Sequence, residues 1–134
     1  MITVSVNIDA TLEKAWDFWN NQNHIKNWYF ASPDWHCPKA QNDLKVNKSF
    51  NIRMEAKDGS FGFDFEGKYT KIIDFELIEY VLADDRKVIT TFEKQEKSVV
   101  ITQKFDAESE NSIALQQNGW QAILDNFKTY IQEN

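Results

Sequence analysis

Residues 49–69 read SFNIRMEAKDGSFGFDFEGKY, and this stretch decides the fold. Apolar and polar side chains alternate on both sides of the pair Asp58-Gly59, and a period of two is typical of a β-strand with one buried face. The apolar positions are Phe50, Ile52, Met54, Phe61, Phe63, Phe65 and Tyr69. Asp-Gly between two such runs is a strong hairpin signal, because the turn needs a positive φ. The stretch therefore predicts an antiparallel hairpin with an aromatic face.

The same alternation continues toward the C-terminus. Residues 77–82, 88–92 and 99–105 predict three more strands, separated by turns at Asp84-Asp85 and at residues 93–97. Ile72-Ile73 interrupts the alternation, which predicts a β-bulge near the end of the preceding strand. Turns this short favour an antiparallel meander.

Before the hairpin, the pattern changes from strand to helix. Residues 2–8 alternate as a strand, and residues 12–19 then carry a helical stripe formed by Leu12, Ala15, Trp16 and Trp19. Residues 22–29 predict a second short helix. Residues 30–43 contain both prolines and are expected to be an irregular loop, but one so rich in large side chains that it packs over the domain.

The C-terminal segment has the period of a long helix, predicted at residues 112–132, with Trp120, Leu124 and Phe127 in one stripe. Gly119 lies inside this helix at an intrinsic cost of about 1 kcal/mol. Either it lets a strand or a ligand approach the helix closely, or it is a tolerated weak position or a kink.

The order of elements predicts an α+β helix-grip fold in one domain, residues 1–134. About seven antiparallel strands curve around the long C-terminal helix, and two short helices lie between strands 1 and 2. A narrow helix cannot fill a curved sheet, so an enclosed apolar cavity is expected.

Composition limits the classes of partner. The net charge of −6 and the absence of a basic stripe argue against nucleic acid and anionic membranes. No apolar run is long enough to span a bilayer, and the N-terminus begins directly in a strand pattern, so a cytoplasmic location is expected. Aromatic residues make up 14 %, which suits either an aromatic core or a space for an apolar guest.

Several segments together resemble a known family. Ile8-Asp9-Ala10 with Ala15-Trp16 is similar to its first strand and "A-P-x-x-x-V-W" helix, and residues 24–28, HIKNW, to its second helix. DLKV at residues 43–46 resembles its "D-L-R-V-G-G" segment, and Gly119-Trp120 the start of its terminal "G-W-x-x-x-L" helix. The family is that of the activator of heat-shock protein 90 ATPase, in its small single-domain bacterial branch, within the START-like (SRPBCC, Bet v 1-like) superfamily.

Two positions depart from the family pattern, both in turns. Asn47-Lys48 replaces the glycine pair, and Thr11 replaces the proline after the first strand. The resemblance implies the helix-grip fold and offers a chaperone as an alternative partner. Other START-like families bind lipids, sterols or polyketides, and a few catalyse cyclisation, so the fold alone does not choose a function.

Twelve residues are the candidate cavity lining. The aromatic stripe suits either a core or a cavity lining. The segment around Trp35-His36 is expected to cap the cavity mouth, with His36 as a polar contact. As a buried phenol, Tyr69 would orient a guest. The candidates are Trp28, Trp35, His36, Phe50, Ile52, Met54, Phe63, Phe65, Tyr69, Trp120, Leu124 and Phe127.

Catalytic, metal and cofactor sites are not expected, with a His/carboxylate metal site left as a minor alternative. Cys37 is the only cysteine, and His24 and His36 are the only histidines, so a tetrahedral Cys/His site cannot form. A nucleophilic role for Cys37 would need a partner base. Arg53, Glu55, Asp64 and Glu66 fall on the face opposite the phenylalanines, where cross-strand ion pairs are the ordinary arrangement.

Three functions remain open. The favoured hypothesis is a binding protein for a small hydrophobic molecule. The second is a protein-interaction module acting on a chaperone, which an exposed apolar patch would favour. The third is an enzyme on an apolar substrate, which lacks an identifiable set of catalytic residues.

Overall fold

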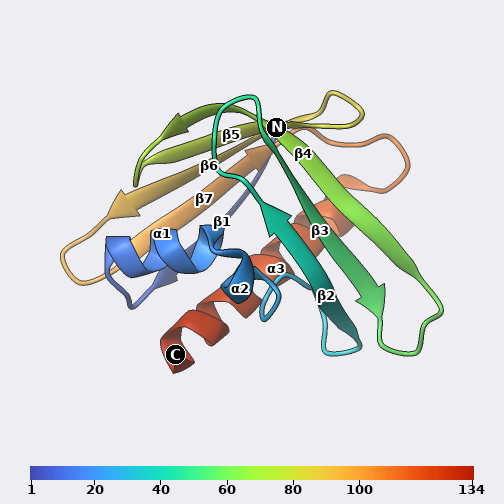
Figure 1. Ribbon diagram of the computed structural model, residues 1–134, viewed down its shortest axis with the longest axis horizontal. Helices are drawn as coiled ribbons and strands as arrows, with labels where there is room; N and C mark the ends of the chain where they lie inside the picture. Colours follow the sequence, from blue (N-terminus) through green and yellow to red (C-terminus); the bar gives the residue numbers. More distant parts are fainter.

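One curved antiparallel sheet organises the chain, and the C-terminal helix crosses its face (Figure 1). The computed structural model describes residues 1–134. The sheet has seven strands in the order β1-β7-β6-β5-β4-β3-β2. In chain order the elements are β1 Ile2–Ile8, α1 Leu12–Asn20, α2 Gln22–Ile25, β2 Trp35–Asn42, β3 Ser49–Ala56, β4 Gly62–Ile73, β5 Leu77–Leu82, β6 Lys87–Lys94, β7 Val99–Phe105 and α3 Ile113–Glu133. The predicted helix-grip fold is confirmed.

Strand β1 forms one edge of the sheet, and glutamines of α3 bind its free backbone groups. Gln121 accepts from the Ser5 N–H at 3.3 Å and donates to the Ser5 carbonyl at 2.9 Å. Gln117 donates to the Thr3 carbonyl at 3.1 Å. These bonds satisfy an otherwise open edge and fix α3 alongside β1.

The C-terminal half of α3 is anchored in the core. Leu124, Phe127 and Ile131 are fully buried. The Phe127 ring meets Trp19 and Trp28 edge-on, at centroid distances of 5.1 and 4.6 Å. Helices α1 and α2 thus close one end of the sheet, and the aromatic cluster holds α3 there.

Two boundaries differ from the sequence-based expectation. Residues 35–42 form strand β2, where residues 30–43 were expected to be irregular, and β2 pairs with β3 with a register shift between His36 and Lys39. Pro38 lies in this bulge, and an edge strand accommodates a residue that cannot donate a ladder hydrogen bond. Helix α2 ends at Ile25, earlier than the predicted residue 29.

The turns follow the sequence signals. Gly59 has φ +79°, as the Asp58-Gly59 hairpin requires. The bulge near the end of β4 lies between Tyr69 and Lys71, slightly before Ile72-Ile73. Asn47 has φ 72°, so the chain adopts the left-handed conformation with an asparagine at the position where the family pattern has glycine.

Replacing Asn47 should separate the backbone requirement from the side chain. Asn47→Ala should lower the free energy of unfolding by about 1 kcal/mol, because alanine tolerates positive φ poorly, whereas Asn47→Gly should stay within about 0.5 kcal/mol of wild type. Urea denaturation of the three proteins measures the difference. Equal stability of the alanine and glycine variants would contradict the assignment of strain to this turn.

Candidate functional site

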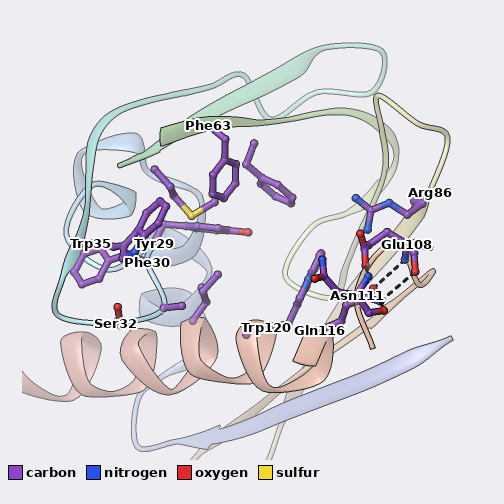
Figure 2. A pocket seen from close by; sticks show the side chains of 15 residues that line it. Tyr29, Phe30, Ser32, Trp35, Phe63, Arg86, Glu108, Asn111, Gln116 and Trp120 are labelled. Carbon is purple, nitrogen blue, oxygen red and sulfur yellow. Dashed lines mark hydrogen bonds between the residues drawn. The ribbon is translucent and has the colours of Figure 1, made fainter. Parts of the chain in front are cut away.

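A pocket of about 390 Å³ opens between the sheet and the N-terminal half of α3 (Figure 2). It is open to solvent rather than sealed. Most of its lining is apolar. The polar residues Arg86, Glu108, Asn111 and Gln116 gather at one end, and Ser32 lies at the other.

The apolar walls come from the segment after α2 and from strands β2, β3 and β4. They are Tyr29, Phe30, Trp35, Met54, Phe63 and Phe65. Ring contacts connect them, with Trp35 and Phe63 centroids 6.0 Å apart and those of Tyr29 and Phe65 5.9 Å apart. Because aromatic side chains have few rotatable bonds, these walls are largely pre-formed.

Helix α3 forms the opposite side with Gly119, Trp120 and Ile123. The Trp120 ring stacks on Phe105 at 3.9 Å and 12°, and its other contact is edge-on to Phe65 at 5.9 Å. A Cβ atom at Gly119 would meet nothing within 4 Å. The helix is therefore not in contact with the sheet at Gly119, which lies within the α3 part of the pocket lining.

The polar end is held by Gln116, a buried side chain of α3. Its amide nitrogen donates to the Glu108 and Asn111 carbonyls at 3.1 and 2.9 Å, and its amide oxygen accepts from the Glu108 N–H at 2.9 Å. Arg86 also lines this end, and its Nε donates to the Asp84 carboxylate at 2.7 Å. The bonds of Gln116 pin the loop before α3 against the pocket.

Three buried tyrosines lie beside the pocket. Burial raises the pKa of the Tyr29, Tyr69 and Tyr80 hydroxyls above their ordinary value. The Tyr69 hydroxyl donates to Asn42 Oδ1. All three phenols are therefore neutral at physiological pH and can donate hydrogen bonds.

The structure brings five of the twelve candidate residues together in the pocket: Trp35, Met54, Phe63, Phe65 and Trp120. Three others, Phe50, Ile52 and Tyr69, line a separate cavity of about 30 Å³, which is water-sized.

The remaining four candidates lie outside both cavities. Trp28, Leu124 and Phe127 are fully buried in the core beneath α1 and α2. His36 stands on the sheet edge, 3.9 Å from the Glu55 carboxylate, with its side chain 43 % exposed. The stripe on α3 is thus divided: its C-terminal half is core, and its N-terminal half lines the pocket.

Sequence reasoning did not select Tyr29, Phe30, Arg86, Gln116 or Ile123 as lining. Tyr29 falls at the end of the second predicted helix, which was expected to reach residue 29. Arg86 falls next to a predicted polar turn. Ile123 and Gln116 share the stripe of Trp120 at helical spacing, so the stripe itself was the available signal. For Gly119 the sequence left two readings open, a close approach of a strand or ligand and a tolerated weak position or kink.

Chemistry outside the pocket is limited. Burial raises the pKa of the Cys37 thiol to about 11, so it is protonated at neutral pH. No three or more His, Cys, Asp or Glu residues are grouped so that they could hold a metal ion. Arg53 binds Glu55 at 2.8 Å and Asp64 at 3.4 Å on the outer face of the sheet. None of the helices has both the length and the apolar character to cross a membrane.

Comparison with known proteins identifies relatives over nearly the full length. The family model of Activator of Hsp90 ATPase homolog 1-like proteins matches residues 9–132. The solution structure of an AHSA1-like protein from Aeromonas hydrophila is 38 % identical, with a TM-score of 0.90 over 98 % of this chain and 93 % of that chain. A solution structure of a protein from Cytophaga hutchinsonii is 48 % identical, with a TM-score of 0.85 over 99 % of this chain and 92 % of that chain.

More distant structures share the fold alone. A crystal structure from Nitrosomonas europaea is 11 % identical, with a TM-score of 0.80 over 98 % of this chain and 95 % of that chain. No curated protein sequence matches this chain significantly.

The division of α3 should appear in stability measurements. Leu124→Ala should lower the free energy of unfolding by about 2–5 kcal/mol, because it opens a void in packed core. Phe63→Ala should cost less than about 1 kcal/mol, since Phe63 is 47 % exposed in the pocket wall. Chemical denaturation compares the two, and a larger loss for Phe63→Ala would contradict this division.

The buried tyrosines should make the fold sensitive to alkali. Above about pH 10, tyrosines of the unfolded chain lose protons while the folded phenols keep theirs, so the unfolded state binds fewer protons and stability falls as pH rises. Urea midpoints from about pH 8 to 11, with phenolate absorbance, test this. Ionisation of Tyr29, Tyr69 and Tyr80 near pH 10 in the folded protein would contradict it.

Proposed function

The chain belongs to the Activator of Hsp90 ATPase homolog 1-like family, and from this premise we propose that it binds a small, largely apolar molecule in the pocket beside α3. The single observation that carries the proposal is the open space over Gly119.

Gly119 has no structural reason to be glycine. It lies inside a continuous helix, where glycine costs about 1 kcal/mol relative to alanine. Its φ is not in the left-handed region, and no neighbouring atom would meet an added Cβ within 4 Å. Neither backbone conformation nor packing therefore requires glycine, and what remains is the empty volume that a side chain would fill.

The pocket has the size and composition of a ligand site. Its volume of about 390 Å³ falls within the roughly 300–1,000 Å³ of small-molecule sites. Its aromatic walls are held by mutual ring contacts, so little ordering is needed on binding. A few polar groups at one end would fix the orientation of the guest.

The same geometry favours binding over catalysis. Arg86 is engaged by Asp84, and Glu108 accepts from the Asn111 N–H at 2.7 Å, so both charged groups already have partners. Tyr29 is neutral, and Cys37 lies outside the pocket. These groups do not form a nucleophile–base pair.

A protein partner is the second candidate. The family name refers to a chaperone ATPase, and the β3–β4 hairpin carries the feature that favours this function here. Phe61 is 73 % exposed beside the half-exposed Phe63. Exposed neighbouring aromatics are typical of contact surfaces. Phe61 does not line the pocket, so variants of Phe61 and of Gly119 separate the two functions.

Filling the space over Gly119 should weaken binding without unfolding the chain. Wild type should enhance the fluorescence of 1-aminoanthracene, a flat neutral dye, and Gly119→Leu should weaken the affinity at least tenfold. Gly119→Ala should raise the free energy of unfolding by up to about 1 kcal/mol. Fluorescence titration and urea denaturation measure the two effects.

The matched control is Asn118→Leu. It adds leucine at the neighbouring, exposed position of α3 and should leave dye affinity unchanged. The proposal fails if Gly119→Leu and Asn118→Leu bind the dye as well as wild type does. Loss of binding in Phe61→Asp alone would move the dye site to the hairpin and favour the second candidate.

A further inference from the structure

A phenol hydroxyl projects into the apolar part of the pocket. Figure 2 shows the Tyr29 side chain reaching from the aromatic wall toward the pocket centre. Only 7 % of the Tyr29 surface is exposed. Its ring lies 4.9 Å from Trp28 and 5.9 Å from Phe65, so the hydroxyl has a fixed position.

The Tyr29 hydroxyl can donate a hydrogen bond into the pocket. Tyr69, by contrast, donates its hydroxyl proton to Asn42. A neutral phenol carries one proton and two acceptor lone pairs, and the position of Tyr29 in the pocket lining lets its hydroxyl reach a ligand.

An apolar ligand that fills the pocket separates this hydroxyl from solvent. A buried donor without a partner costs more than a typical hydrogen bond gains, so a ligand that supplies an acceptor is favoured over one that does not. The same asymmetry lets a site built around one polar group reject analogues that lack the matching atom.

The charges around the pocket favour a neutral ligand. Arg86 is the cation at the polar end, and Asp84 already binds it at 2.7 Å. Glu108 lines the same end, and Glu110 lies with Asp84, Arg86 and Glu108 around an adjoining surface depression. Arg86 and Glu108 balance in charge within the pocket lining, and Asp84 and Glu110 add negative charge at the adjoining depression, which disfavours an anionic guest.

We propose that Tyr29 determines the specificity of the pocket by donating a hydrogen bond to a carbonyl or ether oxygen of a neutral, apolar ligand. This inference rests on the proposed function, and it adds the chemistry of the ligand. The apolar body of the ligand lies between the aromatic walls and the bare backbone at Gly119.

The test is a pair of rigid compounds that differ by one oxygen. 9-Fluorenone and fluorene displace 1-aminoanthracene from wild type and from Tyr29→Phe. The preference for fluorenone over fluorene should fall roughly three- to tenfold in the variant, the worth of one hydrogen bond. Tyr69→Phe is the control, because it removes a buried hydroxyl that donates to Asn42 and should leave the preference unchanged.

Each outcome decides at least one of the two proposals. An unchanged preference in Tyr29→Phe overturns the role of Tyr29 and leaves the proposed function intact, whereas failure of both compounds to displace the dye overturns both. Tighter binding of fluorene-9-carboxylate than of fluorenone would overturn the proposal that the ligand is neutral.

A second measurement keeps the inference testable if Tyr29→Phe does not fold. The carbonyl stretching band of fluorenone bound to wild type should lie at the lower frequency of a hydrogen-bonded ketone. A band at its hydrocarbon-solvent position would overturn the inference.

Discussion

The docking of the C-terminal half of α3 onto the core is the interaction on which the rest of the structure depends. Leu124, Phe127 and Ile131 bury fully, and Trp19 and Trp28 hold Phe127 edge-on. Gln117 and Gln121 then fix the helix along the free edge of β1. These contacts leave the helix no freedom to approach strands β3 and β4 at its N-terminal half.

The pocket follows from this constraint. A straight helix against a curved sheet can contact it closely over only part of its length, and here the contact is made at the end covered by α1 and α2. At Gly119 the space beside the helix is open. Trp120 keeps its place by stacking on Phe105, and Gln116 closes the polar end by binding the preceding loop. The pocket is thus bounded by groups whose positions other contacts fix.

The fold was predictable because its signals are local. Strand alternation, the Asp58-Gly59 turn and the helical stripe of α3 each specify an element, and their order resembles one family. Strand β2 was missed because Pro33 and Pro38 both indicate an irregular segment. The bulge and the edge position make Pro38 compatible with strand pairing.

The site was predictable only in part. A stripe shows which residues of α3 face the sheet, but not how closely each turn packs against it. Leu124 and Trp120 therefore occupy equivalent positions in the sequence pattern. Leu124 is core because it lies in the half of α3 that the contacts of Phe127 anchor. Trp120 lies in the other half and lines the pocket. Arg86 reaches the pocket from a turn whose place in space no pattern reveals, whereas Gly119 carried a readable signal, a helix-weakening residue beside apolar neighbours.

The central claim is that the space over Gly119 receives an apolar guest, and amide chemical-shift mapping tests it most directly. Nitrogen-labelled wild type is titrated with 1-aminoanthracene while the backbone amide resonances are followed. The account predicts that the largest shifts fall at Phe30, Trp35, Met54 and residues 119–123. Shifts confined to the exposed residues Phe61, Phe75 and Ile113, with the pocket amides unchanged, would contradict it.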